Sequence, residues 1–583
     1  MRYLRMLSNS IVAGCLATAY VLTVVLQLNP TVALDRAGLA PLVTTVGLFY
    51  AFHFTVICYV LLVVRQILAR EVFSPAWLSV GVLVWLGALA AAAGAALMCA
   101  NLYTFARVLD ESTVAAMAWG AAMLLLASVL FMLLAGARRV LGSRARGLLA
   151  FIVLVVAGVS VVVPLALRGR GTAPLLQARP LDAAIDFTSA DRVSRVKVIA
   201  IDAGSLDFIA RATAEGRLPN FGRILDTGAV MHLATIHPTS AEAVWAAAMT
   251  GKLPLKNGVR SAGIYRLAAG GDAIQLLPKY CFAYELVWFG FLVEEPHTSA
   301  TLRTRALWSI LSTHGFSVGA VAWPLTQPAP AVRGYVVSDT YLRLALTPSG
   351  IVDSPAVYPA DVQSDVTRAM EDAAADTPAV ASAPAASLEA RHEAPGRTDR
   401  TYDRIARELA EVRSPQVTLT RYQSLDPIGH YFLRYAMPSE FGDVSGDEQR
   451  ALGGVLERHY RLIDDAVGRA IASLGPNDVL LVVSGFGMEP MGLARRLVER
   501  AIGDADLNGT HDAAPDGFLM AYGAPVARGR PPVRPSVVDV TPTILYFLGL
   551  PIGRDMDGYA RTDLFQRAFT DERPITFIPT YDR

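Results

Sequence analysis

The pentapeptide DPIGH places the carboxylate of Asp426 and the imidazole of His430 four residues apart, directly after the strand-like run VTLTRYQSL. A further imidazole, His511 in NGTHD, follows later in the chain. One carboxylate and two histidines are a common ligand set for a divalent metal, with one coordination position left open for water or substrate. Asp426, His430 and His511 are therefore predicted to bind one metal ion.

Two other marked positions also fall at the ends of strand-like runs. Asp202 ends VKVIAID, and the turn Ser484–Met488 follows DVLLVV. Ligands of open α/β sheets bind beyond the carboxyl ends of the strands, so these positions are expected to share a cleft with Asp426. Each signal alone is weak, because an Asp at a strand end is often a helix cap. Their joint placement favours a single site.

Five apolar stretches before residue 170 are long enough to cross a membrane as helices. They cover residues 8–28, 38–66, 77–101, 113–135 and 148–167. We therefore predict a multi-pass membrane domain over residues 1–167, with the lipid bilayer as its partner.

Arginines set the expected orientation of these spans, because cytoplasmic loops are enriched in Arg and Lys. Arginines lie before the first span, after the second and after the fourth, namely Arg2, Arg5, Arg65, Arg70, Arg138, Arg139, Arg144 and Arg146. The alternate loops hold only Arg36 and Arg107. The N-terminus is thus expected in the cytoplasm, and an odd number of spans places the remainder of the chain in the periplasm or the extracellular space.

Beyond the spans, residues 168–195 are rich in Arg, Pro, Gly and Ala, a composition typical of a linker. From residue 196 onward β-branched runs alternate with helical patterns, which predicts an α/β sheet with helices on both faces. The expected strands are 197–202, 316–323, 333–339, 417–425 and 478–485. The low-complexity stretch 371–399 is expected to be a flexible insertion within a domain that covers 196–583.

Charge and cysteine usage exclude some functions. The formal net charge of +1 gives no general attraction to a polyanion, so nucleic acid is not an expected partner. Of the four cysteines only Cys281 lies outside the apolar stretches, which excludes a disulfide framework or a cysteine zinc site in the soluble part.

Several segments resemble one family when taken in order. VIAIDAGSLDFIARATAEGRLPNFGRILDTGAV is similar to the opening of the alkaline-phosphatase superfamily, in its type I phosphodiesterase/nucleotide pyrophosphatase branch. The similarity continues over residues 196–567 through PTSAEAVWAAAMTGKLPLKNGV, DPIGH, VLLVVSGFGM, GTHDAAPDGFLMAYG and DVTPTILYFLGLP. The resemblance implies an alkaline-phosphatase-like α/β/α sandwich, preceded here by about five transmembrane helices.

In that family two metals, commonly zinc, flank the scissile phosphate. The resemblance implies that Asp426, His430 and His511 hold one metal and that Asp202 belongs to the other.

The remaining ligands of the second metal are an Asp-His pair in an SDHG-like turn, where this chain has Gly485 and Phe486. Neither side chain can bind a metal. One divalent metal, zinc by the resemblance, is therefore expected, with the second site empty.

The family's hydroxyl nucleophile lies four residues before a Trp in the following helix, which corresponds to Ala241 counted back from Trp245. Alanine cannot attack phosphorus. Thr239 or Ser240 would supply the hydroxyl if the turn were shifted by one or two residues. The alternative is that these two residues cap the helix that begins near Glu242. A water whose pKa is lowered by the remaining metal is a further candidate nucleophile.

This chain has the residues that the resemblance implies for one metal but not those for the second metal and the nucleophile. Two functions are compatible with this combination. One is a membrane-anchored, extracytoplasmic phosphodiesterase or phosphotransferase with a reduced metal site. The other is a catalytically inactive pseudoenzyme that serves as a binding or scaffolding subunit of a membrane complex. A phosphoester or a lipid-linked molecule is the expected ligand in either case. Activity itself is left open at this stage.

Two further segments have alternative interpretations. The run CFAYELVWFGFLV (281–293) is apolar for an external domain, and it is interpreted as a core element, with a lipid-facing lid as the alternative. Lys252 and Lys256 in TGKLPLKNG resemble a P-loop only superficially, because the glycine spacing is wrong.

Overall fold

The structure, a computed structural model, describes residues 1–69, 73–141, 146–169, 194–345, 355–376, 388–531 and 533–582. The chain divides into two compact units. Unit 1 contains residues 1–174 and 263–296, and unit 2 contains residues 175–262 and 297–583. The segment 263–296, which the sequence analysis placed in the soluble domain, thus groups with the N-terminal helices. Most of the predicted linker 168–195 lies outside the described residues.

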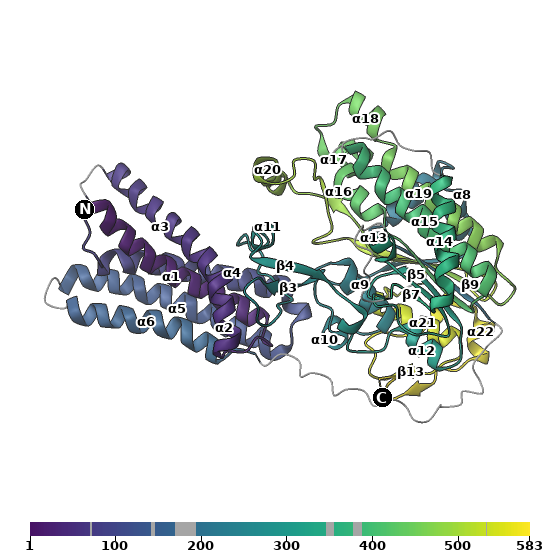
Figure 1. Cartoon of the computed structure of the whole chain (residues 1–583), viewed down its shortest axis with the longest axis horizontal. Helices are drawn as coiled ribbons and strands as arrows, with labels where there is room; N and C mark the ends of the chain where they lie inside the picture. The colour runs from purple at the N-terminus through teal and green to yellow at the C-terminus, as the bar shows by residue number, and fades with distance from the viewer. Residues whose placement is uncertain are drawn as a thin grey trace. The chain divides into compact units, whose positions relative to one another are not determined.

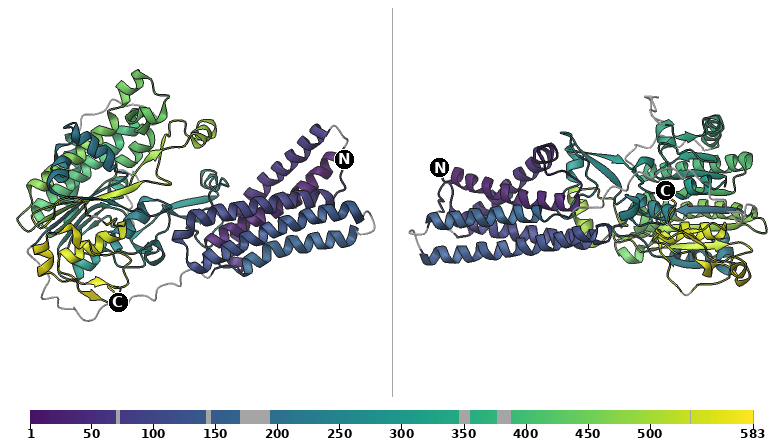
Figure 2. Two further views of the ribbon diagram at one scale, coloured as in Figure 1. Left: turned by 180° about the vertical axis from the view of Figure 1, so that it is seen from behind. Right: turned by 90° about the horizontal axis from the view of Figure 1, so that it is seen from below.

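Unit 1 is a bundle of long apolar helices (Figures 1 and 2). Its helices are α1 Arg2–Leu28, α2 Arg36–Leu42, α3 Leu48–Ala69, α4 Val80–Phe105, α5 Glu111–Leu141 and α6 Arg146–Ala166. A π-helical turn, Val43–Gly47, joins α2 to α3. Among the described residues, five helical stretches are long and apolar enough to cross a membrane: 2–28, 36–68, 80–108, 111–138 and 147–166. The predicted number of spans is therefore confirmed by length and composition.

Polar groups inside the bundle bond to neighbouring helices. The Tyr20 hydroxyl lies 2.9 Å from Ser160 Oγ, and Gln27 Nε2 donates to the carbonyl of Pro164 at 2.7 Å. The Pro164 carbonyl is in the last turn of α6, where a helix leaves carbonyls without an intrahelical donor. These bonds join α1 to α6, the first and last helices of the bundle.

Residues 263–296 complete unit 1. They form the antiparallel pair β3 (Gly263–Leu267) and β4 (Leu292–Pro296), with the short helix α11 (Glu285–Trp288) between them. Buried side chains of this segment, including Ile274 and Leu286, pack in one apolar cluster with residues of α1, α2 and α3.

Unit 2 is built on an eight-stranded sheet with the order β2-β12-β9-β1-β8-β5-β6-β7. The five strands from β9 to β6 are parallel, while β12 and β7 are antiparallel to their neighbours. The strands are β1 Val196–Ile201, β2 Ala229–Leu233, β5 Val318–Trp323, β6 Gly334–Ser338, β7 Val357–Tyr358, β8 Val417–Tyr422, β9 Val479–Phe486 and β12 Asp516–Tyr522. The five parallel strands are the five strands predicted from the sequence.

Helices cover both faces of this sheet (Figure 1). The helices of unit 2 are α7 Leu206–Ala214, α8 Pro219–Thr227, α9 Ala241–Thr250, α10 Pro254–Asn257, α12 Leu307–Thr313, α13 Tyr341–Ala345, α14 Gln363–Ala375, α15 Leu388–Arg413, α16 Leu425–Ala436, α17 Pro438–Phe441, α18 Gly446–Leu452, α19 Val455–Ala472, α20 Leu493–Ile502, α21 Val540–Phe547 and α22 Arg567–Glu572. Short strands β10 Glu489–Pro490, β11 Gly509–Thr510, β13 Ile552–Gly553 and β14 Phe577–Ile578 form small pairs outside the main sheet. This is the predicted α/β/α sandwich.

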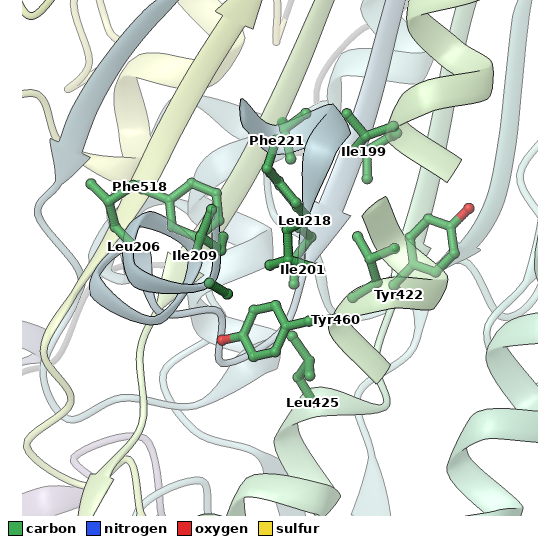
Figure 3. Close-up of a cluster of buried hydrophobic side chains, with 14 of the residues drawn as sticks. Ile199, Ile201, Leu206, Ile209, Leu218, Phe221, Tyr422, Leu425, Tyr460 and Phe518 are labelled. Atoms are coloured by element: carbon green, nitrogen blue, oxygen red, sulfur yellow. The ribbon is translucent and has the colours of Figure 1, made fainter. Parts of the chain in front are cut away.

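Alternate side chains of β1 point to the same face of the sheet, and this explains the apolar core on that face. Ile199 and Ile201 face a cluster that includes residues of α7, α8, α16 and α19 (Figure 3). Leu425 and Tyr460 enter the same cluster from α16 and α19. The first turn of α16, which carries Asp426, is thus fixed against the central strand by buried apolar contacts.

The structure differs from the sequence analysis at the predicted flexible insertion 371–399. Residues 371–375 end α14, residues 388–399 begin α15, and residues 377–387 lie outside the described residues. The Asp399 carboxylate accepts hydrogen bonds from the backbone N–H groups of Gln423 and Ser424, both at 3.0 Å. The alanine-rich composition was interpreted as low complexity, but alanine is also the strongest helix former.

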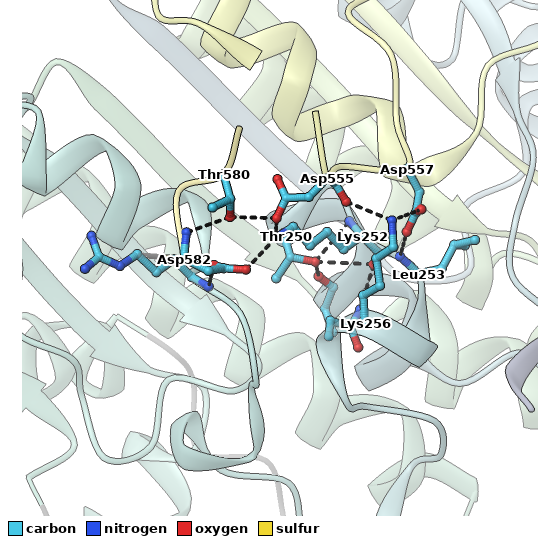
Figure 4. A network of polar contacts seen from close by, with 11 residues as sticks. Thr250, Lys252, Leu253, Lys256, Asp555, Asp557, Thr580 and Asp582 are labelled. Carbon is cyan, nitrogen blue, oxygen red and sulfur yellow. Dashed lines mark hydrogen bonds and ion pairs between the residues drawn. The ribbon is translucent and has the colours of Figure 1, made fainter. Parts of the chain in front are cut away.

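Lys252 and Lys256 belong to an ion-pair network rather than to a phosphate-binding loop (Figure 4). Lys252 Nζ lies 2.5 Å from carboxylate oxygens of both Asp555 and Asp582, and Lys256 Nζ lies 2.5 Å from Asp557. Since Lys252 is buried, these pairs hold the C-terminal segment against the end of α9.

Candidate metal centre

Asp426, His430 and His511 converge in the structure. Asp426 is in the first turn of α16, His430 follows one turn later, and His511 comes directly after β11. One ligand atom from each residue lies within 4.8 Å of the others. Asp426 Oδ1 is 3.7 Å from His430 Nε2 and 3.5 Å from His511 Nε2.

The hydrogen bonds of these residues leave metal-binding atoms available. His430 Nδ1 is 2.9 Å from the carbonyl oxygen of Gly509, and since a carbonyl only accepts, Nδ1 carries the proton and Nε2 carries the lone pair. Among the described residues, buried Asp426 Oδ1 has no hydrogen-bond partner. A buried carboxylate oxygen without a donor is costly unless a cation satisfies it. These residues therefore fit a divalent metal.

The strand that carries His511 is held to α16 by backbone contacts. Asn508 accepts a hydrogen bond from Arg434 N at 3.0 Å, and its own backbone N–H donates to the carbonyl of His430 at 2.8 Å. A Cβ added to Gly509 would lie 2.3 Å from the carbonyl oxygen of Gly429, so only glycine permits this close approach. This packing fixes the distance between His430 and His511.

At the end of the neighbouring strand β1, Asp202 is engaged by protein groups. Arg421 Nη2 lies 2.5 Å from Asp202 Oδ2, and Trp245 Nε1 donates to Oδ1 at 2.6 Å. All three side chains are buried. Although burial disfavours its charge, the Asp202 carboxylate raises the pKa of the Arg421 guanidinium above its usual value. A fixed cation of the protein therefore neutralises Asp202, and a metal-binding role for Asp202 is still only a prediction.

The end of β9 is packed as core. The sequence analysis placed Ser484, Gly485 and Phe486 in a turn, but they are the last residues of this strand. Phe486 is fully buried, and its ring centroid lies 5.3 Å from that of His511. A Cβ added to Gly485 would lie 2.3 Å from Val244 Cγ1. Ser484 Oγ donates to the carbonyl of Phe486 at 2.9 Å and accepts from Gly204 N at 3.0 Å. The volume where longer ligands would stand is filled by Val244.

Residues 239–241, where the resemblance expects the nucleophile, form the N-terminal cap and the start of α9. Ser240 is the N-cap of α9, and its side chain accepts a hydrogen bond from Ala243 N at 3.3 Å. Thr239 Oγ1 donates to the carbonyl of Ile236 at 2.9 Å. The capping interpretation accounts for Ser240, and a nucleophilic role for Thr239 or Ser240 is not supported by any contact with the metal ligands.

Two carboxyls of the cleft have shifted pKa values. Burial raises the pKa of Glu242, in the first turn of α9, to about 7, while Arg421 opposes the rise and Asp202 and Asp426 add to it. Burial also raises the pKa of Asp426, and the His511 and His430 imidazoles oppose that rise. Glu242 therefore exchanges a proton near neutral pH beside the candidate metal ligands.

Sequence reasoning missed Arg421 and Val244. Arg421 lies inside the predicted strand VTLTRYQSL, one position before the end of β8. A charged residue at such a position is a signal for a partner on the neighbouring strand. Val244 gave no signal, because an apolar residue in a helix is ordinary core. Its role emerges only from its distance to Gly485.

A comparison with protein families identifies the family of the chain. A family model described as type I phosphodiesterase / nucleotide pyrophosphatase matches residues 196–542, more than half of the chain. The chain therefore belongs to this family, a class in which metal dependence is typical. No curated protein matches it.

Similar solved structures include two of murine ectonucleotide pyrophosphatase / phosphodiesterase 5, one of them an inactive form in complex with AMP. The similarity has TM-scores of 0.37 and 0.36 at 13% sequence identity, and covers 64% of this chain and 100% of the murine chain in each case.

Proposed function

We propose that this protein is a membrane-anchored phosphodiesterase that binds one divalent metal, zinc by its donor set, at Asp426, His430 and His511. The observation that carries this proposal is the convergence of the three ligand atoms around a buried Asp426 oxygen without a hydrogen-bond donor. When bound, the metal would supply positive charge to a phosphoryl oxygen and acidify a water.

The residues of the chain would perform the remaining tasks. Arg421, buried and paired with Asp202, neutralises that carboxylate at the carboxyl end of the sheet. The net positive charge that favours a phosphoester over a neutral ligand would therefore come from the metal. Glu242, with a pKa of about 7, is suited to accept or return a proton at neutral pH.

A second candidate function is binding without turnover, in which the protein acts as a pseudoenzyme in a membrane complex. It is favoured by Ala241 at the nucleophile position and by the buried Phe486 packed on His511. Phosphoryl transfer needs an attacking oxygen as well as charge stabilisation. In this case the same cleft would retain a phosphoester and not cleave it.

Turnover of bis(4-nitrophenyl) phosphate by the purified full-length chain, with zinc added, tests the first candidate. We expect slow, zinc-dependent release of nitrophenolate that is lost in Asp426→Asn and retained in Asp207→Asn, a control outside the cluster. Zinc binding without turnover in the unmodified protein would select the binding function instead. Absence of both metal binding and turnover would contradict both candidates.

We also propose that unit 2 lies outside the cytoplasm. The support is the asymmetric distribution of arginine between the two ends of the helices, with Arg2 and Arg5 in the first turns of α1. A protease added to intact spheroplasts is expected to degrade unit 2. Full protection in spheroplasts, followed by degradation after lysis, would contradict this orientation.

A further inference from the structure

The segment 263–296 interrupts the matched phosphodiesterase region but is part of unit 1. It has little regular structure between β3 and α11, so its backbone groups need partners from elsewhere in the unit. The groups that form hydrogen bonds with this backbone indicate the environment of the segment.

Two buried asparagines of the helix bundle bond to this backbone. Asn29, at the end of α1, accepts from the N–H groups of Gln275 and Leu276 and donates to the carbonyl of Leu276 at 2.8 Å. Asn101 of α4 accepts from Lys279 N at 2.8 Å and donates to the carbonyl of the same residue at 3.2 Å. Asn29 follows the last residue of α1 and Asn101 lies four residues before the end of α4, so these bonds lie near one end of the bundle. Non-helical backbone that enters the apolar part of a membrane needs such partners from protein groups.

Contacts with α3 also place the segment within the apolar part of the bundle. The Tyr50 hydroxyl donates to the carbonyl of Cys281 at 3.0 Å, and the Phe49 ring lies 5.6 Å from that of Phe291. Phe49 is 13 residues after Arg36, about 20 Å along the helix at 1.5 Å per residue. The contact is thus well inside the predicted span and not at its outer end.

The side of the segment that faces away from these contacts is aromatic. Trp288 is 77% exposed, Tyr280 73% and Phe282 66%, and Tyr284 and Phe289 are also exposed. So many exposed aromatic rings in ten residues are exceptional for a surface in water.

This aromatic surface continues the lipid-facing side of α3. Phe289 contacts Phe49 with ring centroids 6.1 Å apart, and neighbouring Leu48 and Phe52 of α3 are exposed as well. The Tyr284 hydroxyl donates to Glu294 at 2.8 Å, so a polar edge adjoins the aromatic surface. Apolar rings beside a polar edge are typical of the membrane interface.

We propose that residues 280–289 are inserted in the lipid bilayer that holds the helices, with the rings of Tyr280, Phe282, Trp288 and Phe289 against phospholipid acyl chains. The occupant is lipid, because the surface is continuous with the exposed face of a membrane-spanning helix and because buried asparagines satisfy the adjoining backbone. A segment of the phosphodiesterase sequence thereby adds its own contact with the membrane to that of the N-terminal helices on which it packs.

Tryptophan fluorescence in lipid nanodiscs tests this insertion in the full-length chain. In the variant Trp77→Phe/Trp85→Phe/Trp119→Phe, Trp288 is the only tryptophan of unit 1. Trp245, Trp308 and Trp323 of unit 2 are buried and serve as internal references. We expect phosphatidylcholine with brominated acyl chains to remove most of the Trp288 emission, defined as the emission lost on further Trp288→Phe substitution. Aqueous iodide should leave this emission unchanged.

Three outcomes are informative. Quenching of Trp288 by bromolipid but not by iodide supports the proposal. Quenching by iodide alone would show a water-exposed surface, and quenching by neither would show that protein covers it; each overturns the proposal. As a second measurement, Asn29→Ala/Asn101→Ala should increase hydrogen exchange in residues 275–281, whereas the matched unit 2 control Asn220→Ala should not.

Discussion

Two carboxylates of unit 2, Asp426 and Asp202, lie close to the ends of neighbouring strands but have opposite hydrogen-bond states. Asp426 and two histidines converge while Asp426 Oδ1 has no hydrogen-bond partner in the described part of the chain. In contrast, Asp202 is engaged by Arg421 and Trp245. A carboxylate beyond a strand end is therefore not enough to indicate a metal site. Whether its oxygens are already satisfied distinguishes the two cases.

The surroundings of Asp202 leave no void where the family resemblance expects a second metal position. At the positions where that resemblance expects ligands this chain has Gly485 and Phe486, and Val244 and Arg421 supply volume and positive charge beside them. Close packing and charge neutrality are both kept. We therefore predict that the family's ligand residues alone would no longer fit at this position.

The largest effect is expected from Arg421→Met. Removing the guanidinium leaves the Asp202 carboxylate buried and unpaired, which costs about 3–5 kcal/mol of the free energy of unfolding. Urea unfolding of unit 2, followed by tryptophan fluorescence in the full-length chain, measures the loss. The control is Arg368→Met, which removes the exposed ion pair between Arg368 and Asp365. It should lower the free energy of unfolding by less than about 1 kcal/mol. Adding Asp202→Asn should recover part of the loss, and no recovery would contradict the ion-pair explanation.

His430→Ala should weaken zinc binding about 100-fold or more, because three protein ligands are needed to hold the metal firmly. Calorimetric titration of metal-free protein measures the affinity. His232→Ala, which removes an exposed histidine of β2, is the control and should bind zinc normally. Equal affinities in the unmodified protein and in His430→Ala would show that zinc binds elsewhere.

Restoring the family's residues at the expected second metal position should fail. In Gly485→Asp/Phe486→His/Ala241→Thr, the new Asp side chain collides with Val244 Cγ1, and overpacking of this kind costs about 1–3 kcal/mol. We expect one metal per chain and no rise in phosphodiesterase activity, measured by metal analysis and turnover. Two metals per chain with faster turnover would show that the family's ligand residues still fit at this position.

The smallest effect concerns pH. Burial raises the pKa of Glu242 from 4.5 when unfolded to about 7 when folded, so between these values the folded state holds more protons. Stability should therefore fall as pH rises from 4.5 through 7, by on the order of 1–2 kcal/mol after allowance for partial exposure. Unfolding of metal-free protein at pH 5 and pH 8 measures the change. Glu242→Gln should reduce this difference, and an unchanged difference would assign it to other groups.

The sequence predicted the sheet and the metal ligands because their signals are local. Strands such as 196–201 and 417–422 are rich in β-branched residues, and Asp426 and His430 share one helix face at a spacing of four residues. The family motifs supplied His511. These features depend on periodicity and order along the chain, which a single sequence contains.

The remainder depends on contacts between distant residues. The bond between Arg421 and Asp202 joins positions 219 residues apart, and the distance from Val244 to Gly485 follows from the packing of α9 on β9. The apolar run 281–293 could be interpreted as core or as lipid-facing. The structure gives this run a buried side and an exposed side, since Leu286 is buried and Trp288 is exposed. No local pattern distinguishes the two sides of such a short segment.

The membership of residues 263–296 in unit 1 changes what a protease could release. The chain passes between the units at three places, near residue 174, between 262 and 263, and between 296 and 297. A single cut before β1 would leave unit 2 covalently joined through both ends of the β3–β4 segment. Release of unit 2 by one cleavage in residues 168–195 is therefore excluded by chain connectivity, because release requires cuts at all three places.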